Sequence, residues 1–94
     1  MYILQIEHPV FDFESWKRAF DSDPIGRQKT GVRCYRISRP VDDSKYVMID
    51  LEFDTLAQAE ASLAALRALW GRVQGEVMMD SKTRIAEAVE IKSY

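Results

Sequence analysis

The sequence predicts an α+β domain with six elements in the order strand, helix, strand, strand, helix, strand. Residues 46–53 alternate apolar and polar side chains with the period of two that is typical of a half-buried strand. Residues 56–73 repeat apolar side chains at spacings of three and four, as an amphipathic helix does. The chain has 94 residues without a repeat or a linker, so we expect one domain over residues 1–94.

The first strand is expected over Tyr2–His8, where apolar and polar residues alternate. Pro9 ends it, because proline has no N–H to donate to a neighbouring strand. Asp12 is expected to cap the first helix, since its carboxylate can accept a hydrogen bond from a free N–H of the first turn. The apolar stripe of this helix consists of Phe13, Trp16 and Phe20.

A short second helical piece is expected after the first helix. Asp23 can cap it, Pro24 suits the first helical position, and the piece runs to about Thr30. Gly31 is then placed as the residue that ends it. The second strand follows over Val32–Arg39, which is rich in residues that favour strands.

The third strand is expected over Tyr46–Phe53, and the main helix follows it directly. Thr55 and Gln58 have the spacing of a capping box, in which each side chain bonds to the backbone N–H of the other residue. Ser62 lies off the apolar stripe of this helix and is expected on its polar side. The stripe itself consists of Leu56, Ala59, Leu63, Leu66, Trp70 and Val73.

The last strand is expected over Thr83–Ile91, which completes the split βαβ motif of a ferredoxin-like fold. Right-handed crossovers place both helices on one face of a four-stranded antiparallel sheet. Strand three then turns Met48 to the open face, together with Ile3 of strand one and Arg36 of strand two. This face is too apolar for a plain solvated surface, and we expect a homodimer that pairs sheet against sheet. The alternative is a solvated face with scattered hydrophobic residues.

Composition excludes several classes of function. The net charge of −2 offers no electrostatic attraction to nucleic acid or to an anionic membrane. No apolar run approaches the roughly 20 residues that span a bilayer. Cys34 is the single cysteine, which forms no intrachain disulfide and favours a reducing, cytoplasmic location.

Three segments resemble a known family: 11–20 (FDFESWKRAF), 31–37 (GVRCYRI) and 47–59 (VMIDLEFDTLAQA). Together they are similar to the dimeric α/β-barrel superfamily, and especially to its small proteins that resemble antibiotic-biosynthesis monooxygenases and are often labelled cyclase-like. The resemblance covers nearly the whole chain and implies pairing into a dimeric α/β barrel. Members include monooxygenases, haem-degrading enzymes, polyketide cyclases and lactone isomerases, so the resemblance is specific for fold rather than for function.

The resemblance also implies a ligand pocket between the sheet and the helices of one subunit. Tyr35 joins its lining if the second strand faces that way. Carried over to this sequence, the lining consists of Leu4, Ile6, Trp16, Phe20, Ile49, Leu51, Leu66 and Trp70.

His8 and Tyr35 are the candidates for proton transfer, His8 because it is the single histidine and titrates near neutral pH. A surface or capping role is the alternative for His8. The related monooxygenases use an asparagine, a tryptophan and a tyrosine, and the haem degraders use an asparagine, a tryptophan and a histidine. This chain contains no asparagine, so neither set can be transferred to it. No metal-ligand spacing is present, and we expect neither a metal nor a cofactor.

The sequence thus predicts a homodimer that binds a small hydrophobic or aromatic molecule in an apolar pocket on the helix side. One alternative is a cofactor-independent cyclase, isomerase or monooxygenase with His8 or Tyr35 as the proton-handling group. The other is a structural or regulatory interaction module. The sequence leaves open whether the protein is an enzyme.

Overall fold

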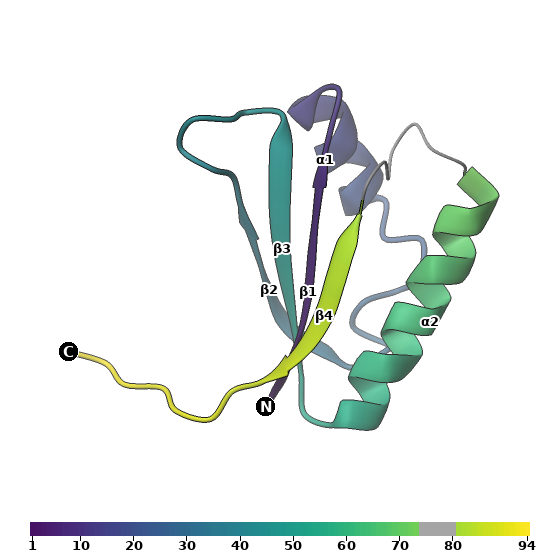
Figure 1. Ribbon diagram of the computed structural model, residues 1–94. Helices are drawn as coiled ribbons and strands as arrows, with labels where there is room; N and C mark the ends of the chain where they lie inside the picture. The colour runs from purple at the N-terminus through teal and green to yellow at the C-terminus, as the bar shows by residue number, and fades with distance from the viewer. Residues whose placement is uncertain (74–80) are drawn as a thin grey trace.

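The computed structural model describes residues 1–73 and 81–94, with side chains over 1–71 and 81–94. The predicted order of elements is confirmed (Figure 1). The elements are β1 (Tyr2–Pro9), α1 (Phe13–Asp21), β2 (Val32–Ser38), β3 (Tyr46–Phe53), α2 (Leu56–Val73) and β4 (Lys82–Glu87).

The four strands form one antiparallel sheet in the order β2-β3-β1-β4. The two central strands pair Leu4 with Leu51 and Ile6 with Ile49. Residues that lie opposite each other in a sheet share a face, so these four side chains point the same way. His8 lies on this face as well, because it follows Ile6 by two residues.

Both helices cover this face of the sheet, and a single hydrophobic core lies between the two layers. The core joins the buried face of the two central strands to one residue of each helix, Trp16 of α1 and Ala59 of α2. Its buried members are Leu4, Ile6, Val10, Trp16, Val47, Ile49, Leu51, Phe53 and Ala59.

Both predicted helix starts are confirmed. Asp12 has an extended backbone (φ −151°), and its Oδ2 accepts a hydrogen bond from the N–H of Ser15 at 3.0 Å. At the start of α2, the N–H of Gln58 donates to Oγ1 of Thr55 at 3.2 Å, and the N–H of Thr55 donates to Oε1 of Gln58 at 3.2 Å. These reciprocal bonds satisfy two backbone donors that the first turn of a helix leaves free.

The predicted stripe of α2 faces the core through Ala59, Leu63, Leu66 and Trp70, but the buried face of the helix also includes Ser62 and leaves out Leu56. Ser62 is buried, with 4% of its surface exposed, whereas Leu56 is 43% exposed. Ala59, Ser62 and Leu66 also follow a spacing of three and four, so the buried stripe runs through a serine. A pattern of apolar residues cannot reveal this, because serine is polar. Val73 belongs to the predicted stripe, but its side chain lies outside those described.

The predicted second helical piece is wrong, because residues 23–31 form a series of turns. Asp23 adopts φ 51° rather than the extended backbone of a helix cap, and its carboxylate accepts the N–H of Arg27 at 2.9 Å. Gly31 has φ 101° and lies against Gln58 of α2, but no helix precedes it. These turns lie between α2 and the sheet.

The last strand is shorter than predicted, ending at Glu87 rather than Ile91. The reason is that β4 pairs with β1, and the partner of Glu87 is Tyr2, the first residue of β1. One more bond follows, from the N–H of Ala88 to the carbonyl oxygen of Met1 at 3.0 Å. The segment beyond runs away from the sheet, on the side opposite α2 (Figure 1). The other predicted strand ends match the structure or differ from it by one residue.

Candidate functional site

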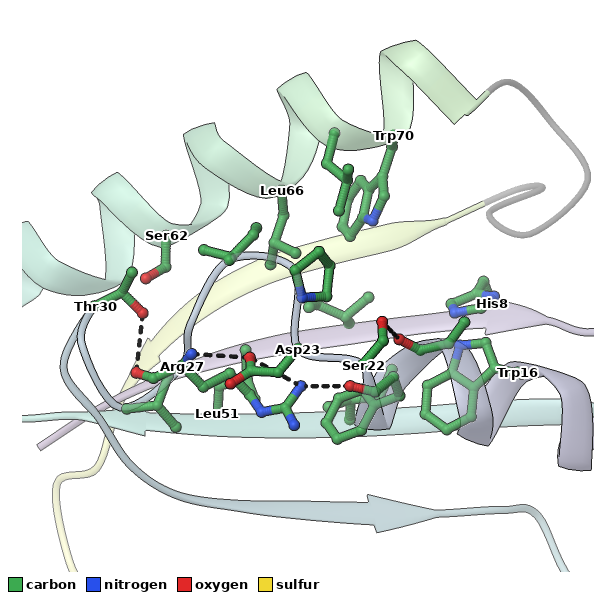
Figure 2. Close-up of a pocket in the computed structure, with 18 residues that line it drawn as sticks. His8, Trp16, Ser22, Asp23, Arg27, Thr30, Leu51, Ser62, Leu66 and Trp70 are labelled. Carbon is green, nitrogen blue, oxygen red and sulfur yellow. Dashed lines mark hydrogen bonds and ion pairs between the residues drawn. The ribbon is translucent and has the colours of Figure 1, made fainter.

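A cavity of about 270 Å³ lies between the sheet and the helices. Its floor is the buried face of β1 and β3, one side is α1, and the other side is α2 (Figure 2). The turns that follow α1 form the remaining wall, through Asp23, Pro24, Ile25, Arg27 and Thr30. Ala19, Ser22, Val32 and Leu69 also line the cavity, together with the residues described below.

Most of the residues that the resemblance assigns to a pocket lie around this cavity. They are Ile6, Trp16, Phe20, Ile49, Leu51, Leu66 and Trp70. Leu4 does not line the cavity, because it is fully buried in the core between Leu51 and Ile85. Tyr35 does not line it either. Tyr35 lies opposite Leu51 and so on the helix side of the sheet, but the residue is 45% exposed. It borders an outer groove that adjoins the cavity at Asp23, Arg27 and Val32.

Aromatic rings form the wall on the α1 side. The rings of Trp16 and Phe20 stack with centroids 5.2 Å apart, and Tyr35 meets Phe20 edge-on at 5.0 Å. The indole of Trp16 also lies 6.1 Å from the imidazole of His8. Aromatic contacts of this kind hold rings in a defined orientation. The wall therefore presents flat apolar surfaces to the cavity.

His8 lies on the floor of the cavity and is fully buried, so it is neither a surface nor a capping residue. Its Nδ1 lies 2.9 Å from the carbonyl oxygen of Pro9. Because a carbonyl only accepts, this contact assigns the proton to Nδ1 and leaves Nε2 as an acceptor. Nε2 has no hydrogen-bond partner in the described part of the chain.

Burial also sets the charge of His8. It lowers the pKa of the imidazole below its ordinary value, and the hydrogen bond to Pro9 opposes this effect only in part. The charged form is disfavoured in an apolar site because it loses its hydration. His8 is therefore a neutral imidazole near pH 7, able to accept a hydrogen bond or a proton from a bound molecule.

Ser62 of α2 is a residue that sequence reasoning missed. Its hydroxyl is buried at the cavity, and no residue whose side chain is described bonds to its Oγ. The available signal was positional, since Ser62 lies three residues after Ala59 and four before Leu66 on the helix. Residues at these spacings share one face of a helix.

Among the described residues of the lining, the two charged ones, Arg27 and Asp23, neutralise each other. The Arg27 guanidinium lies 3.6 Å from the Asp23 carboxylate and donates to the carbonyl oxygen of Phe20 at 2.9 Å. It also lies over the Phe20 ring, 3.9 Å from the centroid. These contacts occupy the cation, so the cavity offers a ligand no unpaired charge from this pair.

Other candidate chemistry lies outside the cavity. Cys34 is exposed on the open face of the sheet, and its thiol donates to the carboxylate of Glu52, which raises the thiol pKa. A raised pKa lowers the fraction of reactive thiolate. Within residues 1–73 and 81–94, no three His, Cys, Asp or Glu side chains gather as metal ligands. Over the same residues, neither helix has the length and apolar character of a membrane span.

Two solved structures share this fold over nearly the whole chain. A candidate antibiotic biosynthesis monooxygenase from Deinococcus radiodurans is 18% identical, with a TM-score of 0.68 over 100% of this chain and 98% of its own. A dimeric ferredoxin-like protein from an uncultured marine organism is 13% identical, with a TM-score of 0.62 over 99% and 97%. No protein-family model matches the chain, and no curated protein is significantly similar to it. The resemblance seen in the sequence is thus confirmed for the fold, and the chain has the ferredoxin-like fold.

Proposed function

We propose that this protein binds a small hydrophobic or aromatic molecule in the cavity between the sheet and the helices. The observation that carries the proposal is an apolar, aromatic-walled cavity that contains two buried polar atoms, Nε2 of His8 and Oγ of Ser62, with no partner among the described residues. Ligand sites combine apolar walls with a few placed polar groups, and the cavity volume is close to their lower bound of about 300 Å³. A neighbour described as a candidate antibiotic biosynthesis monooxygenase adds support.

A cavity-filling variant tests this proposal. N-phenyl-1-naphthylamine is a neutral probe whose fluorescence rises in apolar surroundings. Leu66→Trp puts a larger side chain at the lining, whereas Leu56→Trp makes the same change at an exposed position of the same helix. We expect the wild type and Leu56→Trp to bind the probe equally, and Leu66→Trp to bind it at least tenfold more weakly. Equal binding by all three proteins, or no binding by the wild type, would contradict the proposal.

A cofactor-independent enzyme is the second candidate, and the position of His8 favours it. Of the two candidate residues, His8 borders the cavity with a free acceptor nitrogen, whereas Tyr35 borders the outer groove. A neutral imidazole there could take a proton from an acidic substrate. The test is the ring opening of 5-nitrobenzisoxazole, a neutral aromatic substrate in which a base removes the ring C–H proton while the N–O bond breaks to give a coloured phenolate. We expect the wild type and Tyr35→Phe to accelerate this reaction equally above the rate in buffer, and His8→Phe to lose the acceleration. A wild type that does not accelerate the reaction would count against this candidate.

We also infer that the protein forms a homodimer through the open face of its sheet. This face carries Ile3 and Met48, both half-buried, and it places Arg36 directly opposite Asp50. A two-fold pairing would bury the apolar residues and bring charges of opposite sign together. The dimeric state of one structural neighbour supports this inference.

An interaction module without a ligand is the remaining alternative to the two proposed functions. A cytoplasmic location suits the protein, because the thiol of Cys34 is free and exposed.

Native mass spectrometry tests the homodimer and reports a retained ligand in the same spectrum. We expect a dimer for the wild type and a monomer for Met48→Glu, since the substitution places a charge in the proposed interface. Ala61→Glu, an equal change of charge on the exposed side of α2, should leave the dimer intact. A monomeric wild type would show that the open face is solvated.

A further inference from the structure

Nε2 of His8 and Oγ of Ser62, which have no hydrogen-bond partner among the residues described, lie at opposite ends of the cavity. Figure 2 shows Ser62 beside Thr30 at one end and His8 beside Trp16 at the other, with Trp70 nearer to His8. Ser62 and Trp70 are eight residues apart on α2, which corresponds to about 12 Å along the helix axis. Leu66 lies between them on α2, and most of the lining side chains are apolar, although Ser22 and the paired Asp23 and Arg27 also lie between the two ends (Figure 2). A molecule that reaches both ends is therefore elongated and mostly apolar.

The two ends of the cavity pair with different hydrogen-bonding groups of a ligand. Nε2 of His8 is an acceptor, because the proton of the ring is on Nδ1, which donates to the carbonyl oxygen of Pro9. It pairs with a ligand hydroxyl or N–H group. The hydroxyl of Ser62 can donate or accept, so it pairs with either kind of polar group. Both side chains are more than nine-tenths buried, and no other described residue bonds to either atom.

The charges at the cavity argue for a neutral ligand. Asp23 and Arg27 are paired, and Arg27 also bonds to the carbonyl oxygen of Phe20 and covers its ring. A charged ligand would lose its hydration in the cavity without gaining an unpaired charge of opposite sign from these residues. The apolar length of the cavity and its two polar ends therefore define the ligand together.

Resting on the proposed function, we propose that the cavity selects a neutral, elongated, mostly apolar molecule with a hydrogen-bonding group at each end. One end carries a hydroxyl or N–H that donates to His8, and the other carries a polar group that pairs with Ser62. The two residues determine specificity for this class, because a molecule of the same shape without the polar ends leaves both buried atoms unpaired.

Three rigid probes of one shape test this inference: biphenyl, biphenyl-4-ol and biphenyl-4,4′-diol. Trp16 and Trp70 line the cavity, so quenching of tryptophan fluorescence measures the Kd of each probe. A hydrogen bond of ordinary net strength changes affinity by about fivefold. We therefore expect the diol to bind the wild type about fivefold more tightly than the mono-ol, and the mono-ol about fivefold more tightly than biphenyl.

Variants show which residue causes each fivefold increase in affinity from one probe to the next. In Ser62→Ala, the diol should bind no more tightly than the mono-ol, while the affinity for biphenyl stays the same. His8→Phe should have the same effect. His8→Gln keeps a hydrogen-bond acceptor and should restore the tighter binding of the diol over the mono-ol. It also controls for a folding defect in His8→Phe. Tyr35→Phe removes a hydroxyl outside the cavity and should change nothing.

The outcomes separate this inference from the proposed function. If the wild type binds all three probes with equal affinity, the cavity binds apolar molecules but the two polar ends play no part, and only this inference is overturned. The same holds if Ser62→Ala and His8→Phe both retain the full preference for the diol. If the wild type binds none of the probes, both the inference and the proposed function are overturned.

Discussion

Replacing Ser62 by alanine is expected to stabilise the protein. The hydroxyl is buried with 4% of the residue exposed, and no described residue accepts or donates a hydrogen bond to its Oγ. An unpartnered buried hydroxyl costs about 1 to 3 kcal/mol, and we take about 1 kcal/mol here because the hydroxyl borders a cavity. Alanine also favours an internal helix position over serine by about 0.5 kcal/mol. The expected gain in the free energy of unfolding is therefore about 1.5 kcal/mol.

Urea denaturation followed by circular dichroism measures this change, and a thermal scan should show a rise in Tm of about 6 to 12 °C. Ala61→Ser is the matched control, because it places serine at an exposed neighbouring position of α2 and reports the helix-propensity part alone. If Ser62→Ala gains no more than Ala61→Ser loses, the hydroxyl has a partner and the argument for an unsatisfied atom fails. If Ser62→Ala is more stable than the wild type yet binds biphenyl-4,4′-diol less tightly, Ser62 strengthens binding at a cost in stability.

Three further perturbations follow from local geometry. His8 has a lowered pKa in the folded state, so the unfolded chain binds the proton first as the pH falls. The free energy of unfolding of the wild type should therefore decrease below pH 6.5, by up to about 1.4 kcal/mol per pH unit. Urea titrations at several pH values measure this slope, and His8→Phe should lose it. Thr55→Ala should cost about 1 kcal/mol by removing the cap of α2, and an unchanged urea midpoint would contradict the capping role. Gly31→Ala should destabilise the protein, because φ is 101° and the new Cβ would lie 2.7 Å from Gln58. Gly71→Ala lies in a helix with open space around it and should raise the free energy of unfolding by about 0.5 to 1 kcal/mol. Equal shifts of Tm for the two variants would refute this reasoning.

Features that depend on neighbouring residues were predictable from the sequence. Asp12 caps α1 and Thr55 caps α2 because the atoms involved lie within three residues of one another. The alternation in β3 revealed which side chains face the helices, because the pleat of a strand turns successive side chains to opposite faces. The order of these elements leaves few compact arrangements, so the fold was predictable too.

Features that depend on residues far apart in the sequence could not be predicted from it. β4 ends where its partner β1 begins, and nothing within residues 82–91 marks that point. The turns at 23–31 follow from the backbone of Asp23, at φ 51°, although the same two residues, Asp-Pro, commonly start a helix. A local signal for a helix was overridden there by the packing of the segment between α2 and the sheet.

The candidate site divides in the same way. Its apolar walls could be predicted, because periodicity and the family resemblance place Trp16, Phe20, Leu66 and Trp70 on the buried faces of their helices. The sequence alone thus determined the order of elements, their caps and the apolar face of the sheet, all of which arise from short-range geometry. Only the tertiary structure decided that Nε2 of His8 and Oγ of Ser62, 54 positions apart in the sequence, are both buried at one cavity with no partner in the part of the chain that the structure describes. The physical reason is that burial and the lack of a partner are properties of the packed layers, and no local pattern in the chain encodes them.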